Sequence, residues 1–254
     1  MTQQPKNALV TGGSRRIGRA IASALAADGF GVCIHHNASG EEAAALAAEI
    51  NAQGGRAAAI EVDLMDEAAT GDLIARAGAA LGPLDLLINN ASVFERDEAD
   101  TVTRESWDRH MEVNLRAPFV LIQRFAATLA PEIEGNVINV LDQRVRHLTP
   151  HFTSYTLSKA GLWTLTRTLA LALAPRIRVN GVGPGPVLPS PRQSEAAFQR
   201  QAGATPLGRA VDPADIAQAV RYLVGARSVT GQMIAVDSGQ HLQWGAQGPA
   251  DAEE

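Results

Sequence analysis

The sequence predicts a single α/β domain in which a doubly wound parallel sheet of about seven strands is covered by helices on both faces. Three observations predict this fold. The chain has 254 residues, which suits one large domain with a sizeable core. Short apolar runs alternate with longer Ala-rich stretches. Most of the short runs are apolar almost throughout, as expected for parallel strands that are buried on both sides.

The elements follow one another along the chain without a repeat or a linker. We expect strands at Asn7–Thr11, Gly31–Ile34, Ala58–Val62, Leu84–Asn89, Asn136–Leu141, Ile177–Val182 and Gln232–Val236. We expect helices at Arg16–Ala27, Gly40–Gln53, Glu67–Ala80, Arg104–Leu129, Thr153–Ala174 and Pro213–Val224. Such alternation implies right-handed βαβ units, whose ligands bind beyond the carboxyl ends of the strands.

Two segments do not fit this alternation. Residues 188–209 are rich in Pro, Gln and Ser, and we expect them to form a mobile substrate flap. The domain is expected to span residues 1–244, with residues 245–254 as a frayed acidic tail.

Composition and charge exclude several classes of protein. Hydrophobic residues make up 46% of the chain and charged residues 19%, which excludes a disordered chain and a membrane protein. The net charge is -5 without long runs of like charge, so we expect no nucleic-acid partner and no membrane anchor. Cys33 is the single cysteine, which excludes an internal disulfide framework. Its side chain is expected to be inert and packed in the core. The amino terminus has no secretory pattern, so we expect a soluble, cytoplasmic protein.

A glycine-rich loop directly follows the first strand, where residues 11–18 read Thr-Gly-Gly-Ser-Arg-Arg-Ile-Gly. Glycines permit a tight turn and a close approach of the backbone to a pyrophosphate, and the following helix offers its N–H groups. The strand before the loop and the helix after it favour nucleotide binding over an ordinary glycine-rich turn.

The end of the second strand indicates which nucleotide is bound. It reads His35-His36-Asn37-Ala38-Ser39, without the carboxylate that binds the ribose 2′-hydroxyl in NAD enzymes of this architecture. Arg15 adds a positive charge nearby, and Ser39 could both cap the next helix and contact a phosphate. We therefore predict NADP(H). The alternative is that both histidines only end a strand and that Ser39 is only a cap.

Tyr155 and Lys159 are four residues apart on a predicted helix and therefore share one face. A lysine ammonium close to a tyrosine, together with the positive charge of an oxidised nicotinamide, stabilises the phenolate and brings proton transfer nearer to neutral pH. The pair is expected to be catalytic.

These motifs, with Asp63, Asn89-Asn90-Ala91, Asn114 and Pro184-Gly185 in the same order, resemble the short-chain dehydrogenase/reductase family over nearly the whole chain. The resemblance implies a Rossmann-type fold, an adenine contact from Asp63, and Lys159 on the nicotinamide ribose. It also implies that Asn114 supports a water-linked proton path. The cofactor residues that it implies are Gly12, Ser14, Arg15, Arg16, Ile17, Gly18, His36, Asn37, Ser39, Asp63, Leu64, Asn90, Ala91, Ser92, Tyr155, Lys159, Pro184, Gly185 and Val187.

One departure from the family pattern concerns the catalytic residues. Most members have a serine thirteen residues before the tyrosine, and this chain has Asp142 there. An ionised carboxylate cannot donate to a carbonyl, and it raises the pKa of a neighbouring tyrosine. Asp142 therefore favours a substrate with N–H groups or a C=N bond. The alternative is that Ser154 or a different register supplies the missing donor.

Further departures agree with this interpretation. Arg16 and Ser92 replace glycines of the family pattern, and Phe94 follows at the pocket mouth, where it could stack on a flat heterocycle or only fill the core. With Asp142, these residues resemble the pteridine reductases, and the bacterial dihydromonapterin/dihydrofolate reductases of this fold are also similar. The resemblance implies a pterin between the nicotinamide and Phe94, with Arg16 and Ser92 at its edge and Tyr155, aided by Asp142, as proton donor. Ala38 stands where that branch has a basic residue near the 2′-phosphate.

The sequence leaves two rival functions open. One is reduction of a ketone such as a 3-oxoacyl thioester, and the other is a non-catalytic NADPH-binding scaffold or sensor. The two long helices at 104–129 and 153–174 carry apolar residues on several faces, and family members commonly pair through them, so a homotetramer is expected. His147 and His151 have Pro150 between them, and no metal site is expected there.

Overall fold

The computed structural model describes residues 6–190 and 192–242. Within these ranges seven strands form one sheet, in the order β3-β2-β1-β4-β5-β6-β7, and all neighbouring strands run parallel. The strands are β1 Asn7–Val10, β2 Gly31–His36, β3 Arg56–Glu61, β4 Leu86–Asn89, β5 Gly135–Val140, β6 Ile177–Pro184 and β7 Met233–Val236. The strand order reverses between β1 and β4, which is where ligands of such sheets bind.

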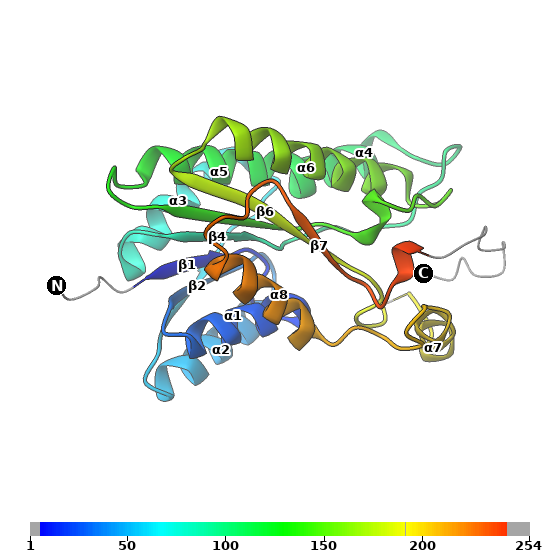
Figure 1. Cartoon of the computed structure of the whole chain (residues 1–254), viewed down its shortest axis with the longest axis horizontal. Helices are drawn as coiled ribbons and strands as arrows, with labels where there is room; N and C mark the ends of the chain where they lie inside the picture. Colours follow the sequence, from blue (N-terminus) through cyan, green and yellow to red (C-terminus); the bar gives the residue numbers. More distant parts are fainter. Residues whose placement is uncertain (1–5, 191, 243–254) are drawn as a thin grey trace.

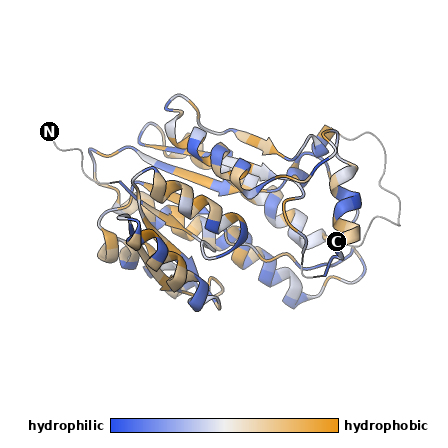
Figure 2. Ribbon diagram, turned by 90° about the horizontal axis from the view of Figure 1, so that it is seen from below, coloured by the Kyte–Doolittle hydropathy of each residue, from blue (hydrophilic) through white to orange (hydrophobic). Residues whose placement is uncertain are grey.

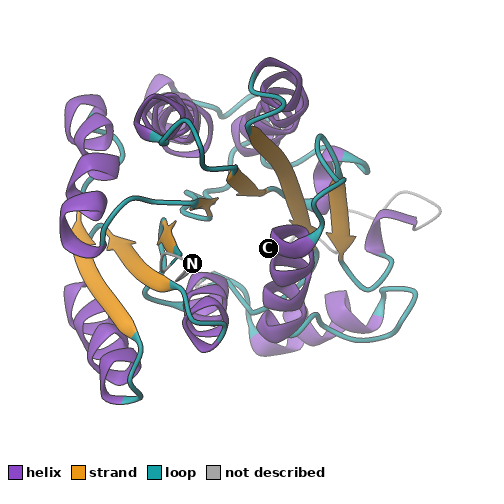
Figure 3. Cartoon of the chain, turned by 60° about the vertical axis from the view of Figure 1, so that its left-hand side comes forward, coloured by secondary structure: helices purple, strands orange, loops and turns teal. Residues whose placement is uncertain are grey.

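Helices cover both faces of this sheet (Figures 1 and 3). One face packs against α1, α2 and α8, and the other against α3, α5 and α6. The helices are α1 Arg16–Ala27, α2 Gly40–Ala52, α3 Glu67–Leu81, α4 Arg104–Met111, α5 Ala117–Thr128, α6 Thr153–Ala172, α7 Glu195–Gly203 and α8 Pro213–Gly225. The predicted doubly wound α/β fold is confirmed.

The core explains why the strands are apolar throughout. Along β1, Ala8 and Val10 point to the layer that contains α1, α2 and α8, whereas Leu9 points to the opposite layer. Successive side chains of a strand alternate between its faces, so a strand covered on both faces needs apolar residues at every position. Figure 2 shows hydrophobic colour on the sides of the helices and strands that face this interior.

The predicted helix at Arg104–Leu129 is divided into three parts. The helix α4 is followed by a π-helical turn, η1 at Glu112–Arg116, and then by α5. Pro118 lies in the first turn of α5, where its missing N–H is tolerated. The π turn contains the predicted site residue Asn114, and such turns are common at functional sites.

The two segments outside the alternation have different outcomes. The expected flap at 188–209 contains a regular helix, α7, and the expected tail at 245–254 lies outside the described residues. None of the described helices combines the length and the apolar character that a membrane crossing requires.

Candidate active site

The glycine-rich loop lies between β1 and α1 at the carboxyl edge of the sheet. Gly12 has a φ of +59°, and a Cβ atom there would lie 3.0 Å from the Ala91 Cα. A Cβ atom on Gly18 would lie only 2.0 Å from the Gly12 carbonyl oxygen. Both positions therefore require glycine, and the bare backbone leaves room for a pyrophosphate at the start of α1.

His35 supports this loop from β2. The Gly12 N–H donates to His35 Nδ1 over 3.1 Å, so the ring proton lies on Nε2, which is 3.0 Å from the Val62 carbonyl oxygen. Burial lowers the pKa of His35 to about 4, so the ring is neutral at pH 7. His35 is therefore structural, as one alternative from the sequence expected.

Two connected cavities contain the predicted cofactor residues. The larger, of about 670 Å³, runs along the loop and the carboxyl ends of β2 and β3. Its lining includes Gly12, Ser14, Arg15, Arg16, Ile17, Gly18, His36, Asn37, Ser39, Asp63, Leu64, Asn90, Ala91 and Ser92. The smaller, of about 270 Å³, is lined by the other five: Tyr155, Lys159, Pro184, Gly185 and Val187. Four residues line both cavities: Arg16, Ile17, Asn90 and Ser92.

The end of the larger cavity beside β2 carries hydroxyl and basic groups. The Ser14 and Ser39 hydroxyls are hydrogen-bonded over 2.6 Å. The expectation that Ser39 caps α2 with its side chain is wrong, because its hydroxyl is engaged with Ser14 and makes no cap bond. Arg15 forms an exposed ion pair with Glu42 at 3.5 Å, a weak interaction that a phosphate could replace.

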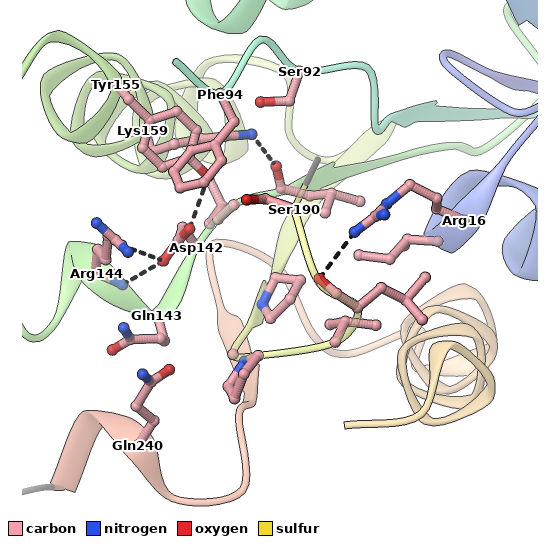
Figure 4. Close-up of a pocket in the computed structure, with 18 of the residues that line it drawn as sticks. Arg16, Ser92, Phe94, Asp142, Gln143, Arg144, Tyr155, Lys159, Ser190 and Gln240 are labelled. Carbon is pink, nitrogen blue, oxygen red and sulfur yellow. Dashed lines mark hydrogen bonds and ion pairs between the residues drawn. The ribbon is translucent and has the colours of Figure 1, made fainter. Parts of the chain in front are cut away.

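The smaller cavity contains the predicted catalytic residues Tyr155, Lys159 and Asp142 (Figure 4). The tyrosine hydroxyl donates to Asp142 Oδ2 over 2.7 Å. Burial, reinforced by the carboxylate of Asp142, raises the pKa of Tyr155 well above its ordinary value. Tyr155 is therefore held in its protonated form, which suits a proton donor.

Lys159 lies one helical turn after Tyr155, as predicted. Its Nζ donates to the Val140 carbonyl oxygen over 2.8 Å and lies 5.9 Å from the centre of the Tyr155 ring. Burial lowers the pKa of Lys159 to about 8, although Asp142 opposes this shift. Burial and Asp142 outweigh the ammonium here, so the Tyr155 pKa is raised, as expected from Asp142. Stabilisation of the phenolate by Lys159 together with the charge of an oxidised nicotinamide stays a prediction.

Asp142 itself is fixed by Arg144. Asp142 Oδ1 accepts from the Arg144 backbone N–H over 2.8 Å, and the Arg144 Nε lies 4.0 Å from the same oxygen. The guanidinium lies over the Phe152 ring at 4.7 Å and over Phe94 at 5.6 Å. Arg144 therefore holds the Asp142 carboxylate in place beside the aromatic rings.

Phe94 forms part of an aromatic cluster that lines the cavity. Its ring stacks on Phe152 with centroids 4.5 Å apart, and it meets the Tyr155 ring edge-on at 4.7 Å. One face of Phe94 is therefore covered by Phe152, so the ring is packed against other side chains and also borders the pocket. Phe94 therefore packs in the core in part, and its stacking on a heterocycle stays a prediction.

Asn114 connects the pocket rim to α6. Its Oδ1 accepts from the Val93 N–H over 2.8 Å and from the Ser92 hydroxyl over 3.2 Å. Its Nδ2 donates to the Val93 carbonyl and to Ser158 Oγ. Asn114 therefore holds the strand-end loop against the helix of Tyr155, and its expected water-linked role stays a prediction.

A buried network holds the amino terminus of α6. Asp97 accepts from the Ser154 N–H over 3.1 Å, from the Ser154 hydroxyl and from the Ser106 hydroxyl. His110 Nδ1 lies 2.7 Å from Ser154 Oγ. One alternative from the sequence was that Ser154 supplies the hydroxyl donor that the family has at the position of Asp142. Ser154 is fully buried in this network, so it cannot donate to a substrate.

The segment after β6 is attached to the pocket at two points. Arg16 donates to the carbonyl oxygens of Leu188 and Pro189, both at 3.0 Å. Arg192 donates to the Phe94 carbonyl oxygen. The predicted flap therefore lies against the loop that was expected to contact cofactor and substrate.

Comparison with known proteins identifies the family. A family model described as enoyl-(acyl carrier protein) reductase matches residues 12–241. The chain is 33% identical over 242 residues to a 3-oxoacyl-[acyl-carrier-protein] reductase FabG of Staphylococcus aureus, covering 93% of this chain and 98% of the relative. The chain belongs to the short-chain dehydrogenase/reductase family.

Solved structures of this family are similar over almost the full length. The FolM alternative dihydrofolate reductase 1 from Brucella canis, complexed with NADP, has a TM-score of 0.93 and 48% identity, covering 95% of this chain and 96% of that chain. A blue fluorescent protein from a metagenomic library, in complex with NADPH, has a TM-score of 0.85 and 36% identity, covering 92% and 97%. These cofactors agree with the predicted NADP(H), and the predicted family is confirmed.

Some residues of this short-chain dehydrogenase/reductase site were missed from the sequence. Gln143 and Arg144 line the pocket and directly follow Asp142 in the chain. Their position just after a strand end could have identified them as site residues. Asp97 and His110 had no such signal, because they lie far from the start of α6 in the sequence and meet Ser154 and Tyr155 only in the fold.

Proposed function

We propose that this oxidoreductase reduces a pterin-like heterocycle, a dihydropterin or dihydrofolate C=N bond, with NADPH as the hydride donor. The observation that supports the proposal is the hydrogen bond between Tyr155 and Asp142 inside a pocket bordered by Phe94. A carboxylate at this place accepts from substrate N–H groups, which a heterocycle has and a simple ketone lacks.

Each of the site residues has a separate role in the proposed reaction. NADPH would lie along the loop and across Pro184, Gly185 and Val187, and it supplies the hydride. Tyr155 gives its proton to a ring nitrogen as the adjacent carbon is reduced. Asp142 orients the tyrosine hydroxyl and is itself held in place by Arg144. Lys159 holds the nicotinamide ribose and places a positive charge near Tyr155.

The heterocycle lies between the nicotinamide and the aromatic cluster in this proposal. Phe94 offers ring surface to a flat substrate, and Arg16 and Ser92 lie at its edge. The segment at 188–209 covers the substrate, since Arg16 and Arg192 join it to the pocket rim. Asn114 supports the proton supply through a water chain.

Charge at the end of β2 supports NADP(H) over NAD(H). His36, Asn37, Ala38 and Ser39 bring no carboxylate to the cavity, whereas Arg15 and His36 bring basic groups. The paired hydroxyls of Ser14 and Ser39 can donate to a 2′-phosphate.

A second candidate function is reduction of a 3-oxoacyl thioester. It is favoured by the FabG relatives and by the description of the family model. Asp142 argues against it, because a carboxylate repels the alkoxide that forms when a ketone is reduced. A non-catalytic scaffold is disfavoured by the assembled set of Asn114, Tyr155 and Lys159.

The test measures NADPH oxidation at 340 nm with 7,8-dihydrobiopterin and, separately, with an acetoacetyl thioester. Turnover of the pterin alone is the expected result. Turnover of the thioester alone would replace the proposal with carbonyl reduction, and turnover of neither across a broad panel would favour the scaffold.

We also propose a homotetramer that works in the cytoplasm. The outer sides of α4 and α6 expose apolar side chains, among them Trp107, Leu157 and Leu171, the last with 83% of its surface accessible. Such residues are suited to a contact between copies. Light scattering that gives the mass of a monomer would remove this proposal.

A further inference from the structure

One wall of the smaller cavity contains buried amides outside the catalytic set. Gln143 is 4% exposed, and its Oε1 has no hydrogen-bond partner within residues 6–190 and 192–242. Gln240 is 6% exposed and lines the same cavity. The Ser190 Oγ is, with Gln143 Oε1, the second buried pocket atom without a partner in the described chain. Buried polar groups are normally hydrogen-bonded, so a group of them facing one cavity points to a ligand.

These side chains come from segments that follow three neighbouring strands at the carboxyl edge of the sheet, with Ser190 in the segment after β6. Gln143 opens the turn η2 (Gln143–Val145) after β5, and Gln240 opens the turn η3 (Gln240–Leu242) after β7. The two turns are in contact. Figure 4 shows both amides beyond Asp142 as seen from Tyr155, so they lie away from the proton donor. They are placed to bind a part of the substrate that does not react.

We propose that Gln143 and Gln240 bind a short, uncharged, hydroxyl-bearing substituent of the heterocycle. This inference rests on the proposed pterin reduction and specifies which pterin is preferred. A glutamine amide offers both N–H donors and a carbonyl acceptor, and a hydroxyl group can accept from the first and donate to the second. The guanidinium of Arg144, next to Gln143 in the chain, is engaged with Asp142 and the aromatic rings, so a carboxylate tail beside the two glutamines meets neutral amides. The small volume of this cavity, about 270 Å³, restricts the substituent to a short one.

The experiment compares two substrates that differ only in this substituent. One is 7,8-dihydrobiopterin, whose substituent carries hydroxyls, and the other is 6-methyl-7,8-dihydropterin. Gln143→Met keeps the length of the side chain and removes its hydrogen bonds. We expect it to lower kcat/KM for dihydrobiopterin about tenfold, the effect of a lost hydrogen bond and a stranded partner, and to leave the methyl substrate within about twofold.

Two further variants complete the design. Gln240→Met should give the same selective loss, and it serves as the second test if Gln143→Met fails to fold. Gln123→Met changes an exposed glutamine of α5 and should affect neither substrate. This inference would be overturned if both pocket variants lost activity equally on the two pterins, or lost none. The proposed function would still stand in that case, as long as the wild-type enzyme reduces the methyl pterin. Wild-type enzyme that reduces neither pterin would overturn both.

Discussion

The hydroxyl of Tyr155 donates to Asp142 Oδ2 over 2.7 Å, so the proposed proton donor is hydrogen-bonded to a carboxylate rather than to a serine. A carboxylate stabilises the neutral tyrosine and raises its pKa, whereas a serine hydroxyl would leave the phenol nearer its ordinary value. The pair therefore keeps a proton in the pocket for a nitrogen that must receive one. It also presents acceptor oxygens to substrate N–H groups.

The substitution Asp142→Ser tests this relationship directly. It restores the hydroxyl donor that a carbonyl substrate needs and removes the acceptor that a pterin needs. We expect pterin kcat/KM to fall by about 100-fold and thioester reduction to rise, because each change corresponds to a charged hydrogen bond of roughly 2–3 kcal/mol. Steady-state kinetics with both substrates measure the outcome. A fall in both activities would mean that Asp142 is required for the structure of η2 rather than for substrate choice.

A carboxylate at the end of β2 should change the cofactor preference. Ser39→Asp places a negative charge beside Ser14, where the 2′-phosphate of NADPH is expected. We expect kcat/KM for NADPH to fall about 100-fold while that for NADH is unchanged or rises, since only NADPH carries the repelled phosphate. Ser39→Ala is the matched control and should cost less than tenfold. Equal losses for both cofactors would argue against a 2′-phosphate at this position.

The sequence predicted most of the fold because its signals were local. Each strand boundary lies within two residues of the prediction, since apolar runs and glycine turns act over a few residues. The π turn at η1 was not predicted, because Pro118 read as part of one long amphipathic helix. Burial of the catalytic side chains was also not predicted. Burial raises the Tyr155 pKa more than the sequence could show, because its surroundings come from β5 and η2 as well as from its own helix.

The network around Asp97 should control both stability and turnover. Burial alone would raise the pKa of Asp97, but hydrogen bonds from Ser106 and Ser154 lower it overall, so the carboxylate is ionised in the folded protein. Asp97→Ala strands those donors, and we expect the free energy of unfolding to fall by about 3 kcal/mol. Ser154 directly precedes Tyr155, so loss of the network should also misplace the tyrosine hydroxyl. We therefore expect kcat of this variant to fall by a larger factor than its KM rises. Asp100→Ala, at an exposed position of the same loop, is the control for denaturant unfolding and kinetics. A variant as stable as the wild type would show that the network is not needed to hold α6.

The buried ammonium of Lys159 should make the stability of the cofactor-free protein depend on pH. Burial lowers its pKa from 10.5 to about 8 in the folded state. Between these values the unfolded chain binds the proton that the folded chain has lost, so this group makes stability rise with pH over that interval. The difference between the two pKa values corresponds to a change of about 3 kcal/mol at most in the free energy of unfolding. Comparing the wild type with Lys159→Met by urea unfolding from pH 7 to 10.5 isolates the effect. The stability of the wild type relative to the variant should increase with pH, and a constant difference would show that the ammonium is well solvated in the folded protein.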